Sequence, residues 1–184
     1  MSYNDFITSG KKTLQQKLSK KNIHEVPTIN KVVVAMGIGS LASRKWVKDF
    51  SDLESNLMDI TGQKPHIILS KKAISNFKLR VGMPVMLRVT LRGKKAYDFI
   101  ERLTTFVLPR IRDFNGLSLK KFDGMGNYHL WLKQQTLFPE IAPEDVKVAM
   151  GIQISIDTSA YSNEDAKHLL ESLGCVFVKP NVSN

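Results

Sequence analysis

The chain of 184 residues has a single cysteine, Cys175, and it has no long apolar run. One cysteine excludes a disulfide within the chain and fits a reducing compartment. No apolar run approaches the length of about 20 residues that a membrane span needs. Residues 1–21 lack the apolar block and small-residue cleavage site of a secretory signal. We therefore expect a cytoplasmic protein with no membrane partner.

The common signatures of catalysis and metal binding are also missing. The four histidines do not stand at metal-ligand spacing with one another or with the cysteine, so no zinc site is expected. No G-x-S-x-G elbow, Walker A loop or G-x-G-x-x-G loop occurs. Residues 123–127 look superficially like a calcium loop, but they lack its alternating carboxylates and distal Glu. We expect neither a metal nor a cofactor.

Acidic residues are absent from one long stretch. Residues 62–95 contain nine Lys or Arg and no Asp or Glu, within a chain of net charge +10 and pI about 9.7. Such an excess usually indicates a polyanionic partner, either nucleic acid or an anionic membrane face. The simpler alternative is a generally basic, solvated surface.

Apolar periodicity predicts several helices. The clearest covers residues 43–60, where apolar side chains recur at steps of three and four and Gly62 follows as a stop signal. Its apolar stripe consists of Trp46, Phe50, Leu53, Leu57 and Ile60. The other expected helices are residues 4–20 (apolar side Phe6, Ile7, Leu14 and Leu18), residues 94–108 (Tyr97, Ile100 and Leu103 inward), and one opened by a capping box at Ser162 and Asp165 and closed by Gly174.

Strands are expected at residues 26–39, 66–69, 84–91, 128–132 and 152–156. Because helices and strands do not alternate regularly, we expect an α+β fold, a mainly antiparallel sheet with helices packed on one side and a long basic loop protruding. We expect a single domain over residues 1–184. It would comprise a basic helical arm (1–22), an α+β body (23–179) and a tail (180–184).

The strand 84–91 suggests how RNA could bind. Val85, Leu87, Val89 and Leu91 alternate on one side, so Met86, Arg88, Thr90 and Arg92 face the other way. Arg offers paired donors to phosphate oxygens, and Thr can bond a 2′-hydroxyl group. A merely solvated sheet face remains the alternative.

The loop before that strand combines charge with an aromatic ring. Lys71, Lys72, Lys78 and Arg80 bracket Phe77, and Ser75 and Asn76 favour a turn. The phenyl ring either stacks on a base or packs under its own loop, and the second arrangement is the more common. A loop of this length is typically functional or mobile.

Gly37 and Gly39 stand in a strand-to-helix turn that could offer backbone N–H groups to a phosphate. A plain tight turn is the simpler interpretation, because two glycines alone are weak evidence for a nucleotide site.

Ordered motifs between about Val26 and Gly174 carry a resemblance to a known family. They are TGQKP (61–65), FKLR (77–80), GMP (82–84), VTLRG (89–93), LPRIRDF (108–114), GLS (116–118), FDG (122–124), GNY (126–128) and FPEI (138–141). The chain resembles the ribosomal protein L5 family in its bacterial form, large-subunit proteins that bind 5S ribosomal RNA in the central protuberance.

The resemblance implies a structural constituent of the cytoplasmic ribosome and not an enzyme. Its implied partners are 5S rRNA, 23S rRNA, P-site tRNA and a small-subunit head protein across an intersubunit bridge. Together with the charge pattern, it gives 5S rRNA-binding residues Gly37, Gly39, Gln63, Lys64, Arg88, Thr90 and Arg92. It gives a tRNA-facing loop of Lys72, Ser75, Asn76, Phe77, Lys78 and Arg80. Two alternatives are a free-standing RNA chaperone or regulator, and an enzyme holding a nucleotide at the turn of residues 37–40.

The chain departs from the family pattern at several positions. Ala35 stands where Asn is usual, Met125 where Arg is usual and Trp131 where a small residue is usual, and Gln134 replaces a Glu. The Ala35 and Met125 replacements each remove a contact to RNA that the family pattern implies. Trp131 offers a large aromatic surface to a neighbouring protein or RNA.

Overall fold

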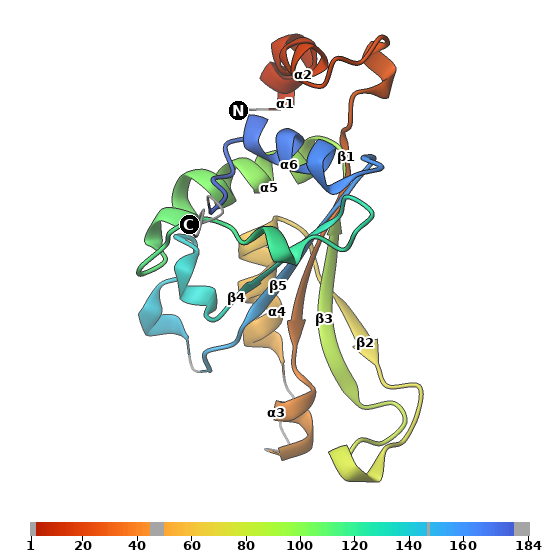
Figure 1. Ribbon diagram of the computed structural model, residues 1–184. Coiled ribbons are helices and arrows are strands. Elements are labelled where there is room, and N and C mark those ends of the chain that lie inside the picture. Colours follow the sequence, from red (N-terminus) through yellow and green to blue (C-terminus); the bar gives the residue numbers. More distant parts are fainter. Residues whose placement is uncertain (1–2, 45–49, 147, 179–184) are drawn as a thin grey trace, which may run out of the picture. The chain divides into compact units, whose positions relative to one another are not determined.

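The computed structural model describes residues 3–44, 50–146 and 148–178. A five-stranded sheet has the strand order β2-β3-β1-β5-β4 (Figure 1). Its strands are β1 (Ile29–Gly37), β2 (His66–Leu69), β3 (Pro84–Leu91), β4 (Tyr128–Leu132) and β5 (Ile152–Thr158). The expected strands 66–69, 84–91 and 128–132 are confirmed at both ends, and β5 runs two residues beyond its expected end at 156.

Pairing within the sheet is antiparallel. β2 pairs with β3 in antiparallel register. Next to β1 and β5, the Ser159 N–H donates to the Thr28 carbonyl, and the Asn30 side-chain amide donates to the Asp157 carboxylate. Residue numbers therefore increase along one strand while they decrease along the other, which is the antiparallel arrangement. The predicted α+β class with a mainly antiparallel sheet is confirmed.

The helices are α1 (Tyr3–Asp5), α2 (Lys11–Lys17), α3 (Gly39–Arg44), α4 (Ser51–Thr61), α5 (Lys94–Arg102) and α6 (Asn163–Ser172). A π-helical turn, Phe6–Gly10, joins α1 to α2, and a second, Leu103–Val107, continues α5 into a 3-10 turn at Leu108–Arg110. Further 3-10 turns are Ile23–Glu25, Ser75–Phe77, Leu119–Lys121, Gln135–Leu137 and Pro143–Asp145. None of the described helices combines the length and apolar character that crossing a bilayer requires.

The chain divides into two compact units. Unit 1 consists of Met1–Val32, Arg92–Leu130 and Ser155–Asn184, and unit 2 of Val33–Leu91 and Trp131–Ile154. The expected single domain with an arm and a tail stays a prediction.

Unit 1 buries the N-terminal helical segment through its aromatic side chains. Phe6 is fully buried, and its ring lies 5.2 Å from that of Tyr97 in α5. The Tyr97 hydroxyl in turn accepts the Ile29 N–H at 3.0 Å. The prediction that Ile7 shares this apolar side is wrong, because Ile7 is exposed. In this π-helical turn the Phe6 ring takes the buried place against Tyr97, and the neighbouring Ile7 side chain is left exposed.

The C-terminal helix of unit 1 begins and ends as its sequence predicts. The Asp165 N–H donates to the Ser162 Oγ at 3.1 Å, which caps the first turn of α6. After α6, Gly174 adopts a φ of +96°, which glycine tolerates without strain.

Unit 2 has its apolar stripe on α4, which contacts β3. Phe50, Leu53, Leu57 and Ile60 are buried as predicted, while Trp46 lies outside the described residues. The expected single helix 43–60 is wrong at its start. Residues 39–44 already form α3, and Phe50 has a non-helical backbone (φ −115°, ψ 15°), so α4 begins at Ser51. Gly62 ends α4 in the left-handed region, as expected.

Candidate RNA interface

The hairpin of β2 and β3 carries most of the predicted site residues. Its register places His66 opposite Arg88, and Ile68 opposite Met86. Since residues opposite one another share a face, His66 and Arg88 project from the same side of the hairpin. The alternation along β3 is confirmed, because Leu87 is buried while Arg88 is exposed.

The outward face of β3 presents polar groups in sequence. Arg88 is exposed, Thr90 is half-buried, and Arg92 is exposed directly after the strand. Gln63 and Lys64 are exposed just before β2. Arg92 begins a segment of unit 1, whereas the other four residues belong to unit 2, and all five lie on or directly beside the β2–β3 hairpin.

The long loop is a folded hairpin tip. Ile74 and Leu79 exchange two backbone hydrogen bonds, of 3.0 and 3.1 Å. They enclose the turn Ser75–Phe77 and Lys78, whose φ is +53°. The turn expected at Ser75 and Asn76 is confirmed. The loop therefore extends the β2–β3 hairpin, so the tip residues have a defined backbone.

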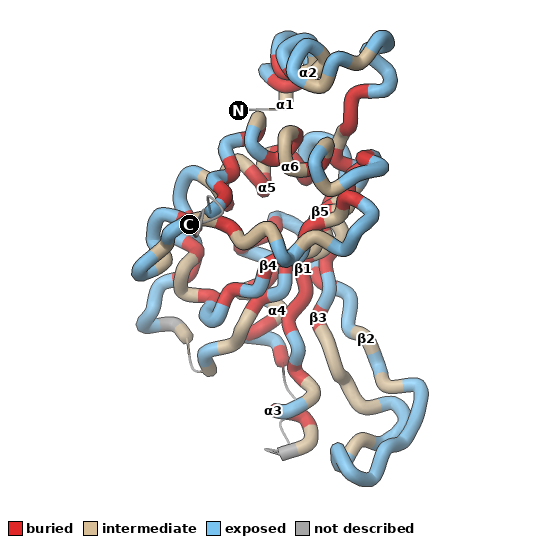
Figure 2. The backbone as a smooth tube through the Cα atoms, viewed as in Figure 1, coloured by how far each residue is buried: buried red, intermediate tan, exposed pale blue. Residues whose placement is uncertain are grey.

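The Phe77 ring does not pack under the loop. Phe77 is 72% exposed, so the more common of the two expected arrangements is wrong. Figure 2 shows most of the segment that joins β2 to β3 coloured as exposed. Phe77 lies in the four-residue turn, 75–78, that the pairing of Ile74 with Leu79 closes. Val81, further along the loop, is also 67% exposed. The tip thus offers apolar surface among its cations.

Most cations of residues 62–95 have no acidic partner among the described residues. In the described part of the chain, no carboxylate forms an ion pair with Lys64, Lys71, Lys72, Lys78, Arg88, Arg92, Lys94 or Lys95. Arg80, the ninth cation, has an interaction within the chain.

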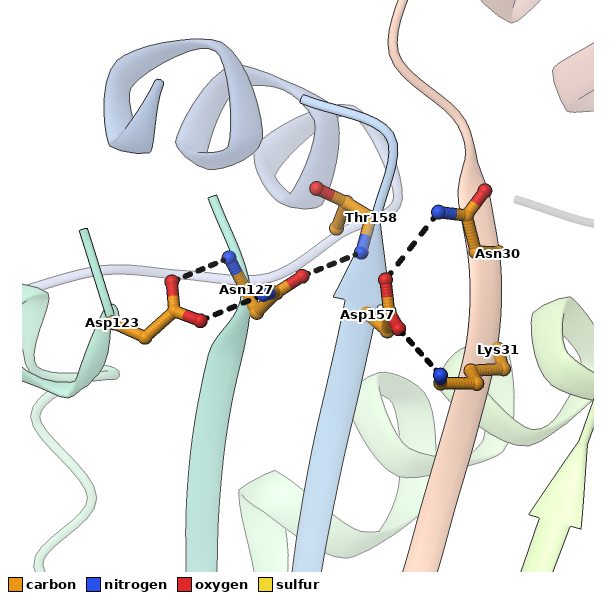
Figure 3. Close-up of polar contacts among 6 residues, drawn as sticks. All are labelled: Asn30, Lys31, Asp123, Asn127, Asp157 and Thr158. Atoms are coloured by element: carbon orange, nitrogen blue, oxygen red, sulfur yellow. Dashed lines mark hydrogen bonds and ion pairs between the residues drawn. The ribbon is translucent and has the colours of Figure 1, made fainter. Parts of the chain in front are cut away.

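Some cations of unit 1 have acidic partners. Lys31 pairs with Asp157 at 2.9 Å (Figure 3), and Lys20 pairs with Asp165 at 3.1 Å. The eight cations on and beside the hairpin have no such partner among the described residues, so their charge is available to an external anion.

The glycine turn is a strand-to-helix connection, as its simpler interpretation predicted. Gly37 ends β1 and Gly39 begins α3. The Ile38 N–H donates to the Val85 carbonyl at 2.8 Å, so this amide is not available to a phosphate. A Cβ at Gly39 would lie 3.3 Å from the Val85 side chain, whereas one at Gly37 would meet nothing within 4 Å. Gly37 is thus open to the close approach of a partner.

The Asp123 loop uses its carboxylate within the chain. Asp123 accepts the N–H groups of Met125 and Asn127 and the Asn127 side-chain amide, at 2.8, 3.0 and 2.7 Å. Burial pushes the pKa of Asp123 upward, but these hydrogen bonds outweigh it and hold the pKa below its usual value. Among the described residues, no group of three His, Cys, Asp or Glu is placed to hold a metal ion.

Comparison with known proteins finds one family along most of the chain. A family model described as ribosomal protein L5 matches residues 22–80, and a second model, which describes the C-terminus of the same ribosomal family, matches residues 84–177. The chain belongs to the ribosomal protein L5 family. It is therefore a ribosomal protein, a structural constituent and not an enzyme, and the resemblance seen in the sequence is confirmed.

Curated relatives match almost the whole chain. The chain is 47% identical to a large ribosomal subunit protein uL5 of Natranaerobius thermophilus, over 91% of this chain and 92% of that protein. It is 48% identical to uL5 of Thermus aquaticus, over 90% of each chain. With uL5 of Thermotoga sp. strain RQ2 the identity is 46%, over 89% of this chain and 88% of that one. All three are named as proteins of the large subunit, the subunit that the resemblance implied.

The structure also adds a residue to the candidate site. His66 was not among the predicted contacts, yet the register places it opposite Arg88 on the outward face. In β2, His66, Ile67 and Leu69 are all exposed, so the burial pattern of this strand does not show which face of the hairpin His66 occupies. Only the pairing with β3 assigns the face.

Proposed function

We propose that this protein is a structural component of the large subunit of the cytoplasmic ribosome and that it binds 5S rRNA through the β2–β3 hairpin. The outward residues of β3 and the segment before β2 form the 5S surface: Gln63, Lys64, Arg88, Thr90 and Arg92, with the turn at Gly37 and Gly39. In this role the protein also lies close to 23S rRNA.

The observation that carries this proposal is the unbalanced charge on and beside the hairpin. Eight cations of residues 62–95 have no carboxylate partner within the described residues. Binding of such cations to RNA phosphates releases condensed counterions, which favours association at low salt. Thr90 and Gln63 add donors and acceptors for the 2′-hydroxyl groups that distinguish RNA.

We assign a second role to the hairpin tip. Lys72, Ser75, Asn76, Phe77, Lys78 and Arg80 face P-site tRNA, and the exposed Phe77 ring supplies a surface on which a base or ribose can pack. The folded tip supports this role, because a defined backbone loses little entropy on binding. Other loops of the protein meet a protein of the small-subunit head, as in an intersubunit bridge.

A binding assay titrated with salt tests the first role. The protein is mixed with 5S rRNA and, separately, with a tRNA of similar charge. We expect tight binding to 5S rRNA alone, with log affinity falling by about 0.7–0.9 per phosphate contact for each tenfold rise in salt. Equal, weak binding to both RNAs would show that the charge acts without specificity, and it would overturn the proposal.

A further inference from the structure

The outward face of the sheet in unit 2 carries a large aromatic side chain on β4. Trp131 is 56% exposed, whereas Leu130 and Leu132 on either side of it are buried. Its indole rests against the next strand, because a Cβ at Gly151 would lie 2.6 Å from the Trp131 Cζ2 and 3.1 Å from its Cε2. A side chain at position 151 would displace the ring. The bare glycine backbone therefore supports the indole on one side and leaves the rest of it open.

Strand register places Trp131 at one end of a row of outward side chains. β4 and β5 are neighbours in the sheet, and the His129 Nδ1 and Ser155 Oγ are hydrogen-bonded across them at 3.0 Å. In an antiparallel pair, counting two residues along each strand gives the next pair on the same face. Gln153 therefore lies beside Trp131. Gln153 is exposed, so its side-chain amide is open to a partner that reaches the indole.

The row continues from β5 to β1. The Lys31 side chain meets the Asp157 carboxylate across these strands at 2.9 Å (Figure 3). Counting four residues along each antiparallel strand brings Ala35 beside Gln153. Ala35 has only a methyl side chain, so the middle of the row stays low and does not block a ligand that crosses it.

Arg88, which the proposed function assigns to 5S rRNA, completes the row on β3. The Ile38 N–H donates to the Val85 carbonyl at 2.8 Å where β1 ends and β3 begins, and counting three residues along each strand brings Ala35 beside Arg88. Adjacent strands lie about 4.8 Å apart, and β3, β1, β5 and β4 are consecutive in the sheet. The backbones at Arg88 and Trp131 are thus about 14 Å apart across the strands. A few nucleotides of one RNA strand can cover that distance.

The charge around the indole favours an anionic partner. Residues 128–139 and 148–156 contain Lys133 and no Asp or Glu. Lys133 is exposed, and within the described residues no carboxylate forms an ion pair with it. Of the acids next to these segments, Asp157 is already in an ion pair and Glu140 has an interaction within the chain. An open aromatic ring beside an unpaired cation is the combination that binds single-stranded nucleic acid.

We propose that Trp131 stacks on an unpaired base of 5S rRNA. Gln153 bonds the edge of that base or its ribose, and Lys133 meets a neighbouring phosphate. The ligand is an unpaired nucleotide, because bases inside a helix already stack on one another and present no free face. The inference rests on the proposed function, since Arg88 brings the RNA onto this face. It extends the RNA surface from the hairpin to the opposite edge of the sheet.

The fluorescence of the indole tests the stacking. The chain has two tryptophans, and Trp46→Phe leaves Trp131 as the one that reports. This variant is titrated with 5S rRNA and, as a control, with a tRNA of similar charge. We expect 5S rRNA to quench the emission, with saturation at the RNA concentration that saturates filter binding, and we expect tRNA to leave it unchanged. Unchanged emission at saturating 5S rRNA would overturn the proposal.

Substitutions at position 131 separate stacking from apolar bulk. Trp131→Ala should lower 5S affinity about 5- to 150-fold, the effect of losing one base–aromatic stack. Trp131→Phe keeps a ring and should retain most of the affinity, whereas Trp131→Leu should lose about as much as the alanine variant. Equal losses from Phe and Leu, or no loss from Ala, would contradict stacking. Phe106→Ala is the matched control, because it removes a 53% exposed aromatic from unit 1 and should leave 5S affinity unchanged.

The salt dependence separates this contact from the proposed function. Stacking releases no counterions, so Trp131→Ala should lower 5S affinity at every salt concentration and keep the slope, whereas Arg88→Gln should flatten it. If the unaltered protein does not prefer 5S rRNA to tRNA, the proposed function fails and the inference fails with it. If it prefers 5S rRNA but Trp131→Ala binds equally well, the inference alone fails, and the indole is left for a protein partner.

Discussion

Replacing Arg88 with Gln should weaken 5S binding without unfolding the protein. Arg88 is exposed, has no ion pair within the described residues, and stands between the buried Leu87 and Val89. Losing a hydrogen bond from a charged donor costs about 1.5–3 kcal/mol, an affinity loss of about 10- to 100-fold. The salt dependence should flatten by about 0.7–0.9, the value of one phosphate contact. Unfolding free energy should change by less than about 0.5 kcal/mol, as for other surface positions.

The assay is a salt series of filter-binding curves with 5S rRNA, paired with urea unfolding of each variant. Lys167→Gln is the matched control, because it also removes one positive charge, but from a residue that already pairs with Glu171 at 3.6 Å. Arg88→Gln should lose affinity and slope where Lys167→Gln loses little of either. Identical curves for the two variants would show that net charge alone drives binding, and that the outward face of β3 has no special role.

Three further predictions address the tip, the loop packing of unit 1 and the lone thiol. Deleting residues 75–78 should spare 5S binding but weaken tRNA retention on reconstituted ribosomes, and loss of 5S binding would contradict a separate tip role. Gly126→Ala should destabilise unit 1 by about 1–3 kcal/mol more than Gly124→Ala in urea unfolding, since both have positive φ but only Gly126 would place a Cβ against a backbone oxygen. Equal midpoints would refute that packing. Burial raises the pKa of the Cys175 thiol to about 12, so iodoacetamide should label it in urea and not in the native state at mildly alkaline pH. Equal labelling rates would place it at the surface.

The strands could be predicted from the sequence because their signals are local. In β3, apolar and polar residues alternate at a period of two, and the structure buries Leu87, Val89 and Leu91 and exposes Arg88. The helix end marked by a glycine could also be predicted from local sequence, since Gly62 adopts the left-handed conformation that ends α4. The outward direction of Arg88 and Thr90 therefore followed from the pattern alone.

The errors arose where tertiary contacts decide the outcome. The sequence around Phe77 fits both an exposed and a packed ring, and the folded protein exposes it. Ile7 and Phe6 both fit an apolar side, but only the position of Tyr97 determines which of them is buried. The start of α4 depends on the backbone at Phe50, which the apolar stripe does not show.

Counting charged residues in the sequence could not show which cations of the candidate site have acidic partners. The net charge of +10 treats Lys31 and Arg88 alike. In the folded protein Lys31 meets Asp157 from a distant part of the chain, while Arg88 meets no carboxylate among the described residues. An acid-free window succeeded in finding the hairpin because β2 and β3 are consecutive strands, so each is the other's neighbour and neither brings an acid. A local count fails for Lys31, because its acidic partner Asp157 lies on a strand that is distant in sequence. Local charge counts therefore predict unpaired cations best on a hairpin, where the neighbouring strand is also the next strand in sequence.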